Sequence, residues 1–187
     1  MSAASASASG SVLGLLAAHA RALGLAGDRQ AQWGAISALL QEAFGHKLFT
    51  ALVHLEAHRL MKRLHTSDES ISPLGGFKAT GNGPWSRLVL QEGQIYVASN
   101  EDDVRTVFSE APMLIDRGLQ SAFNIPVRHE GRVIGSLNML SGRHAYDDAN
   151  HDLAALVGGL CAPVFIEEMR AAQLAAEGVD RSALDSV

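Results

Sequence analysis

The sequence predicts an α+β fold in which helices gather on one face of a central antiparallel β-sheet. Apolar residues follow a helical period near both ends of the chain and a strand-like period of two between them. Neighbouring strand-like segments are joined mostly by hairpins or by connections of varied length. Such connections argue against regular βαβ winding and therefore against a parallel sheet.

Composition and charge exclude several classes of protein. The chain has 187 residues, of which 47% are hydrophobic, so it suits one domain with a substantial core. The net charge is −5 and the basic residues are scattered, so no nucleic-acid partner is expected. No apolar run reaches the roughly 18 residues of a membrane span, and the N-terminus lacks the basic start of a signal peptide. We therefore expect a cytoplasmic protein without a membrane partner.

The chain contains a single cysteine, Cys161. One cysteine excludes an intramolecular disulfide and any metal site built from several thiolates. Because Cys161 lies in an apolar run, we expect a buried and chemically inert thiol.

Helical patterns mark the two ends of one predicted domain over residues 11–176. A flexible Ala/Ser-rich tail is expected over residues 1–10, and a second tail over residues 177–187. The N-terminal part of the domain is predicted to contain two helices, and Asp28 is the candidate N-cap of the second.

The predicted sheet lies between these helical ends. Strands are expected over residues 47–55, 59–66 and 94–98, a hairpin over 119–140, and short helices over 84–90 and 101–108. Residues 67–84 are rich in Gly and Pro, and so long an irregular segment indicates a functional role. A last helix over about 147–176 has Asp147 or Asp148 as its candidate N-cap, and Pro163 inside it predicts a kink.

The predicted hairpin contains two asparagines in mostly apolar strands, and matching the apolar faces puts Asn124 across from Asn138. The two-residue turn Glu130-Gly131 would miss this register by one residue. A slip of one residue would turn every apolar side chain to the wrong face, so we expect a bulge or a three-residue loop.

Alternation along the strands then gives the sheet an apolar face and a polar face. The apolar face is predicted to carry Phe49, Ala51, Val53, Leu55, Phe123, Ile125, Val127, Leu137 and Met139. The polar face is predicted to carry Thr50, Arg63, His65, Asn124, Ser136 and Asn138. A buried polar group without a partner costs about 1–3 kcal/mol. The polar face therefore either faces water, or is covered by residues 67–116 with a ligand completing its hydrogen bonds, or pairs its two asparagines as scaffolding.

Several segments resemble the GAF family of small-molecule sensor domains over roughly residues 30–170. The resemblance is carried by NIPVRHEGRVIGSLNML (124–140), RLHTS (63–67), PLGGFK (73–78) and AYDD (145–148). The sequence looks most like bacterial stand-alone GAF proteins. The resemblance implies a central antiparallel sheet with the terminal helices on one face and, on the other, a ligand cavity covered by loops and short helices.

This sequence lacks the residues that carry the known ligand-binding and catalytic chemistry of this family. The N-K-x-x-F-D-E signature of cyclic-nucleotide-binding members is not found. Bilin-binding members attach their chromophore through a cysteine, and Cys161 lies in the last predicted helix. Free methionine sulfoxide reductases are similar in size, but they need redox cysteines in the pocket, and residues 1–160 contain none. No cofactor is therefore expected.

A cavity on the polar face would take a small organic anion. Arg63, His65 and Lys78 supply cations, and an arginine offers a two-pronged donor to a carboxylate. Phe77, Trp85 and Phe108 supply apolar walls. The predicted ligand-binding residues are Thr50, Arg63, His65, Phe77, Lys78, Trp85, Phe108, Asn124, Ser136 and Asn138. In the alternative interpretation, Arg63 pairs with Asp68 or Glu69, Lys78 is a solvated loop residue and Trp85 belongs to the core.

Two histidine-containing clusters are candidate metal sites. His54, Glu56 and His58 alternate along a strand end, and His144, Asp147, Asp148 and His151 gather near the last helix. A strand end and a helix N-cap explain the two patterns, so no metal is predicted. No Ser/His/Asp or Cys/His arrangement can be assembled, so no catalytic residue is assigned.

The sequence thus predicts a sensor domain that binds a small anionic metabolite and forms a homodimer through its terminal helices. Two alternatives stay open. One is an enzyme on this scaffold, related to the free methionine sulfoxide reductases without their cysteines, with His65 as an acid–base group. The other is a protein-interaction module with a vestigial cavity.

Overall fold

Two helices form the N-terminal unit of the chain, Met1–Gly45, in a computed structural model that describes residues 3–179 and 184. The helices α1 (Ala3–Leu25) and α2 (Arg29–Ala43) contact each other. As predicted, Asp28 caps α2, since its Oδ1 accepts a hydrogen bond from the amide of Ala31 at 2.8 Å.

The first helix begins at Ala3, whereas a flexible tail was predicted over residues 1–10. Alanine has the highest helix propensity, so an Ala/Ser repeat can continue a helix that apolar residues start. Residues 1 and 2 lie outside the described residues, as does most of the predicted tail over 177–187. The predicted single domain over 11–176 spans parts of both compact units, and its boundaries stay a prediction.

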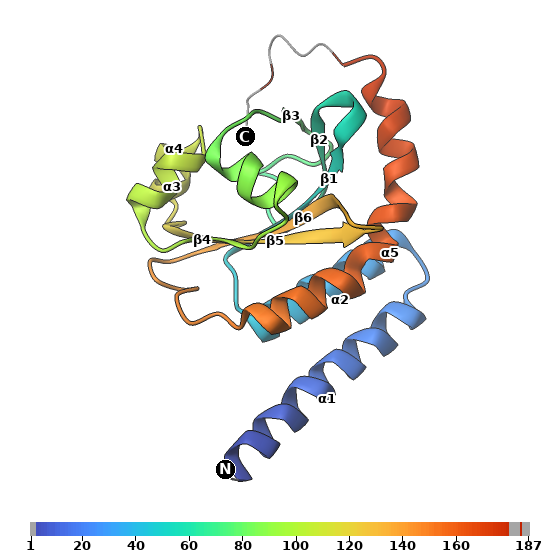
Figure 1. Ribbon diagram of the computed structural model, residues 1–187, viewed down its shortest axis with the longest axis vertical. Coiled ribbons are helices and arrows are strands. Elements are labelled where there is room, and N and C mark those ends of the chain that lie inside the picture. The colour runs from blue at the N-terminus through green and yellow to red at the C-terminus, as the bar shows by residue number, and fades with distance from the viewer. Residues whose placement is uncertain (1–2, 180–183, 185–187) are drawn as a thin grey trace. The chain divides into compact units, whose positions relative to one another are not determined.

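The second unit, His46–Val187, contains a six-stranded antiparallel sheet (Figure 1). Its strands are β1 (Leu48–Leu55), β2 (Leu60–Thr66), β3 (Phe77–Ala79), β4 (Tyr96–Ala98), β5 (Ser121–His129) and β6 (Arg132–Ser141). They lie in the order β3-β2-β1-β6-β5-β4. The α+β prediction is confirmed, and β3 is an additional strand inside the segment predicted to be irregular.

The long helix α5 (His151–Ala176) packs on the apolar face of the sheet, where it contacts β1, β5 and β6. All nine residues predicted for this face are buried. The helix is capped by Asn150, whose Oδ1 accepts from the amide of Leu153 at 3.0 Å, and not by Asp147 or Asp148. The carboxylate of Asp147 instead lies 2.7 Å from Nδ1 of His144, so it is committed to the preceding turn. Pro163 lies inside α5, which changes direction along its length in Figure 1.

We expect the thiol of Cys161 to be unreactive in the folded protein. Cys161 is buried on α5, and burial raises the pKa of its thiol to about 12. Because the thiolate is the reactive species, labelling by a disulfide reagent at pH 8 should be about a thousandfold slower than in the urea-unfolded chain. Following the labelling spectrophotometrically in both states checks this. Rapid labelling of the folded protein would mean that α5 leaves the sheet far more readily than its packing implies.

The opposite face of the sheet is covered by three short helices. These are the π-helix η2 (Ser86–Gln91), α3 (Glu101–Val107) and α4 (Ala111–Asp116). Asn100 caps α3, with Oδ1 accepting from the amides of Asp102 and Asp103. The helix α4 was not predicted.

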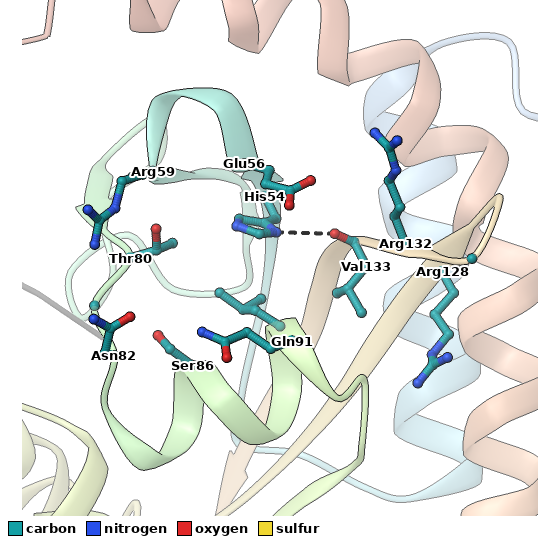
Figure 2. Close-up of a pocket in the computed structure, with 13 residues that line it drawn as sticks. His54, Glu56, Arg59, Thr80, Asn82, Ser86, Gln91, Arg128, Arg132 and Val133 are labelled. Carbon is teal, nitrogen blue, oxygen red and sulfur yellow. Dashed lines mark hydrogen bonds between the residues drawn. The ribbon is translucent and has the colours of Figure 1, made fainter.

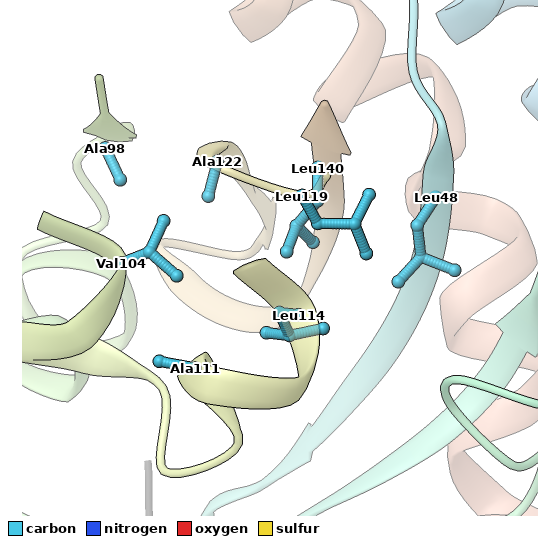
Figure 3. Packing of buried hydrophobic residues seen from close by; sticks show 8 residues of the cluster. All are labelled: Leu48, Ala98, Val104, Ala111, Leu114, Leu119, Ala122 and Leu140. Atoms are coloured by element: carbon cyan, nitrogen blue, oxygen red, sulfur yellow. The ribbon is translucent and has the colours of Figure 1, made fainter. Parts of the chain in front are cut away.

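Apolar clusters seal this covered face at two places. Figure 3 shows Val104 of α3 and Leu114 of α4 directed toward Leu48, Ala122 and Leu140 of the sheet. A second cluster beneath η2 consists of Leu52, Met61, Trp85, Val89 and Leu90. The face predicted to be polar is therefore polar only between the two clusters.

The hairpin register is confirmed, because Asn124 pairs with Asn138. The expected bulge is present, since Val127 pairs with Gly135 but Arg128 pairs with Val133. The two-residue turn Glu130-Gly131 is also present, with φ angles of 48° and 76°. The bulge absorbs the one-residue mismatch that this turn creates, and both asparagines keep to one face.

Within the described residues, no helix is both long and apolar enough to cross a membrane.

Candidate ligand-binding site

A cavity of about 50 Å³ lies between the covered face of the sheet and the segments packed over it. It lies between β1, β2, β3 and β6 on one side and Trp85 and the α3–α4 segment on the other. Six of the predicted ligand-binding residues line it, namely Thr50, Arg63, Lys78, Trp85, Phe108 and Asn138. A buried water needs about 10–15 Å³ by the same kind of measure, so the cavity has room for only a few waters as it stands.

Arg63 projects from β2 into this cavity and is only 9% exposed. Its Nη1 donates a hydrogen bond to the carbonyl of Pro73 at 2.9 Å, and its Nε has no partner. Among the described residues it forms no ion pair, although the more distant Glu110 favours its charged form. Burial is the largest influence and lowers the pKa of the Arg63 guanidinium. The protein therefore holds a buried cation without a directly bonded anion, which is costly unless something else compensates it.

Lys78 of β3 forms an ion pair with Glu110, the residue that precedes α4. The two side chains, 12% and 28% exposed, place Nζ and Oε1 2.5 Å apart. Burial alone would raise the pKa of Glu110, but the charge and hydrogen bond of Lys78, aided by Ser109, lower it overall. This ion pair ties the start of α4 to the sheet across the cavity. Glu110 was missed in the sequence because no local pattern connects it with a residue 32 positions away.

The two asparagines do not bond to each other. Asn124 accepts a hydrogen bond from the indole Nε1 of Trp85 at 2.8 Å. Asn138 donates long bonds to the carbonyls of Thr50 and Ser136, at 3.5 and 3.4 Å. The paired-scaffold interpretation is therefore wrong.

Among the residues that the structure describes, four buried polar atoms on this face lack a partner. Alongside Arg63 Nε they are Asn124 Nδ2, Ser136 Oγ and Asn138 Oδ1. Such atoms are rare in native proteins, and each calls for a water, an ion or a ligand. Asn124 and Ser136 belong to the covered face but do not line the cavity in its present form.

His65 lies on the other face of the sheet, contrary to prediction. Ala51 pairs with His65, but Leu52 pairs with Arg63, so Leu64 is the extra residue of a bulge in β2. The bulge turns His65 toward Phe49 of the apolar face, with 5.2 Å between ring centroids. Burial, reinforced by the nearby His46, lowers the pKa of His65.

Phe77 also lies away from the cavity. It pairs with Lys62 of β2, whose Nζ lies 5.7 Å from the Phe77 ring centroid. Alternation along β3 puts Phe77 opposite its neighbour Lys78. The cavity wall expected from Phe77 is instead made by Trp85 and Phe108, with Val107 and Leu114 beside them.

Histidines of the two candidate metal clusters have other contacts. The Nδ1 of His54 lies 3.1 Å from the carbonyl of Val133, and His144 contacts Asp147. In the part of the chain that the structure describes, no three His, Cys, Asp or Glu side chains come together as metal ligands.

Comparison with known proteins identifies relatives of this architecture. A model of the GAF domain family matches residues 36–165. The GAF domain of a phosphoenolpyruvate-protein phosphotransferase from Acinetobacter superposes with a TM-score of 0.67 at 12% identity, covering 86% of this chain and 96% of its own. The type II free methionine-R-sulfoxide reductase from Thermoplasma acidophilum gives 0.58 at 19% identity, covering 74% and 92%.

The GAF domain of a two-component sensor histidine kinase from Bacillus halodurans gives a TM-score of 0.55 at 18% identity, covering 74% of this chain and 93% of its own. At these identities the structural likeness establishes the fold and not the ligand. No protein with a curated function matches the sequence significantly.

Proposed function

Because the chain belongs to the GAF domain family, we propose that it is a regulatory module that binds a small organic anion in the cavity beside Arg63. The observation that carries this proposal is the charge balance of the cavity lining. Arg63 and Lys78 face the single carboxylate of Glu110, which leaves one net positive charge out of water. A monocarboxylate would neutralise it and give the guanidinium the two-pronged partner that it lacks.

The unpartnered polar atoms support a ligand that also carries hydrogen-bonding groups. Asn124 Nδ2 can only donate, Asn138 Oδ1 can only accept, and the hydroxyl of Ser136 can do either. A carboxylate with a neighbouring hydroxyl, carbonyl or amino group matches this set better than a purely apolar acid.

Binding requires the covering segments to move, because the cavity of about 50 Å³ is much smaller than typical ligand pockets of about 300–1,000 Å³. The cover is tied to the sheet by the bond from Arg63 to Pro73 and by the Lys78–Glu110 ion pair. We propose that the ligand carboxylate binds Arg63 and competes with Glu110 for Lys78, which weakens the hold of this ion pair on the start of α4. The ligand would then stabilise an open arrangement of the covering segments, because a ligand shifts the protein toward the conformation that it binds more tightly.

The output we propose is a homodimer formed through the terminal helices. The helix α5 exposes Leu156, Leu160 and Ile166, and α1 exposes Leu13 and Leu25. Exposed apolar side chains that recur along a helix favour association with a second helix.

An interaction module is the second candidate function, because the cavity is small and apolar clusters seal the face around it. The enzyme alternative loses its proposed acid–base group, since His65 lies on the other face, and Cys161 is buried on α5.

A thermal-shift screen of matched carboxylates and amides separates these functions. Lactate, pyruvate and benzoate would each be compared with the corresponding amide at equal concentration. At a hundred times its Kd, a bound carboxylate should stabilise the fold by about 2.7 kcal/mol, and its amide should do little. Equal effects of acid and amide, or no effect of any acid up to about 10 mM, would favour the interaction module.

Within the same screen, we expect Glu110→Gln to bind the best carboxylate about tenfold more tightly. The substitution removes the internal carboxylate that competes with the ligand for Lys78. Losing this competing charge should make the binding free energy more favourable by about 1.4 kcal/mol, which is a factor of ten in Kd. Titration calorimetry of the variant and the parent protein measures the change. Glu42→Gln, at an exposed position of α2, is the matched control. Weaker binding by Glu110→Gln would show that Glu110 holds the ligand instead of competing with it.

A further inference from the structure

A second, larger hollow lies at one end of the sheet (Figure 2). This groove of about 600 Å³ is bordered by the β1–β2 turn, η2 and the β5–β6 hairpin. It shares no lining residue with the cavity beside Arg63, and the cluster containing Trp85 and Val89 separates the two. Its volume is within the range of small-molecule sites without any rearrangement.

Polar side chains from three segments converge on this groove. Figure 2 shows His54 of β1, Thr80, Asn82, and Ser86 and Gln91 of η2 arranged around it. Leu90 and Val133 provide apolar surface between them. Hydroxyls and amides so placed suit a ligand with several hydroxyl groups, because each can donate and accept.

His54 has a defined hydrogen-bonding role here. Its Nδ1 lies 3.1 Å from the carbonyl of Val133, and a carbonyl can only accept, so Nδ1 carries the proton. Burial, the largest influence, lowers the pKa of His54 and keeps the ring neutral. The Nε2 is then an acceptor, and it forms no hydrogen bond with any described residue. A ligand hydroxyl can donate to it.

The groove is also positively charged. Arg59, Arg128 and Arg132 border it, and Glu56 is the one carboxylate in its lining. Arg128 donates to the carbonyls of Glu92 and Gly93, at 2.7 and 2.8 Å. The guanidinium of Arg59 forms no hydrogen bond or ion pair with the described residues, so it is free to bind an anion.

The backbone of Arg59 adds an independent argument. Its φ of 52° lies in the left-handed region, which a glycine would adopt without strain. The conformation is fixed by hydrogen bonds from the Arg59 amide to Glu56 at 3.0 Å and from the Thr80 amide to the Arg59 carbonyl at 2.9 Å. Strained non-glycine residues concentrate at functional sites, and here the strain presents a guanidinium beside Thr80 and Asn82 (Figure 2).

We propose that this groove is a second ligand site, and that it binds a polyhydroxylated anion such as a sugar phosphate or a sugar acid. Arg59 binds the anionic group, and His54 Nε2 accepts from a hydroxyl of the same molecule. Thr80, Asn82 and Gln91 bind the remaining hydroxyls.

Titration calorimetry of the full chain with glucose 6-phosphate and gluconate tests this site. At least one should bind, and the tighter of the two identifies the anionic group. Arg59→Asn removes the guanidinium while keeping a residue that tolerates the left-handed region, and should weaken binding at least about tenfold. His54→Asn keeps a donor for Val133 but removes the Nε2 acceptor, and should weaken binding several-fold. Arg105→Gln, at an exposed ion pair of α3, should change nothing.

Three results would overturn the second site. One is no binding of either anion up to about 10 mM. Another is binding that Arg59→Asn and His54→Asn both leave unchanged while melting curves show them folded. The third is loss of binding in Arg63→Met, because the anion would then occupy the other cavity. Sorbitol, which has hydroxyls and no charge, and inorganic phosphate, which has the charge alone, complete the series. If phosphate bound as tightly as glucose 6-phosphate, the proposed binding of ligand hydroxyls would be refuted.

Discussion

The Arg63→Met variant is expected to bind the carboxylate that best stabilises the parent protein about a hundredfold more weakly. Truncating one member of a buried, hydrogen-bonded charge pair costs about 2–5 kcal/mol, and about 2.8 kcal/mol is a factor of a hundred. Arg63 would make such a pair with the ligand, since its guanidinium is buried and has no bonded carboxylate. Methionine keeps much of the side-chain volume, so the fold should survive.

Calorimetric titration of the parent protein and two variants measures this effect. Arg105→Met is the matched control, because Arg105 is an exposed arginine whose ion pair with Asp102 lies on the surface of α3. Its affinity should stay within about twofold of the parent, as expected for an exposed pair. An equal loss in both variants would point to general electrostatic attraction, and no loss in Arg63→Met would remove the basis of the proposed function.

The second large effect is expected at Gly135, where substitution by alanine should destabilise the protein by about 3 kcal/mol. Gly135 lies on β6 where α5 crosses the sheet. A Cβ there would lie 2.5 Å from the carbonyl oxygen of Leu52 and 2.5 Å from Cε1 of Phe165. The oxygen belongs to a paired strand and cannot retreat, so the sheet and helix must separate.

Thermal unfolding followed by circular dichroism measures the loss, which corresponds to a fall in Tm of roughly 6–12 °C for a protein of this size. Gly159→Ala in α5 is the control, since a Cβ there meets nothing within 4 Å. That variant should gain about 0.5–1 kcal/mol from helix propensity. If Gly135→Ala were as stable as the parent, α5 would not be packed on β6 as closely as described.

The sequence predicts this fold well wherever local pattern and burial agree. The apolar side chains of β1 and β5 alternate without interruption, so their common face follows directly from the period of two. The hairpin register is predictable because any slip would bury the wrong face, and the bulge follows from that constraint. Asn100 and Asp28 are local caps whose function depends on residues two or three positions away.

The errors arise where distant contacts decide the structure. Phe77–Ala79 pairs with β2 although it follows a run of Pro and Gly, and three residues carry too little pattern to reveal a strand. The bulge at Leu64 has no local signal, yet it moves His65 to the other face. The same limit applies to the site. Arg63 and Asn138 are predictable from strand alternation, whereas Lys78 and Glu110 reach the cavity only through the pairing of β3 with β2 and the packing of α4.

The outermost strands of the sheet, β3 and β4, contain three residues each. Free edges this short offer few backbone groups to a neighbouring chain, which protects the sheet against edge-to-edge aggregation. The same shortness argues against a dimer that continues the sheet from one subunit into the next. Self-association of this chain, where it occurs, should therefore proceed through side chains on its helices.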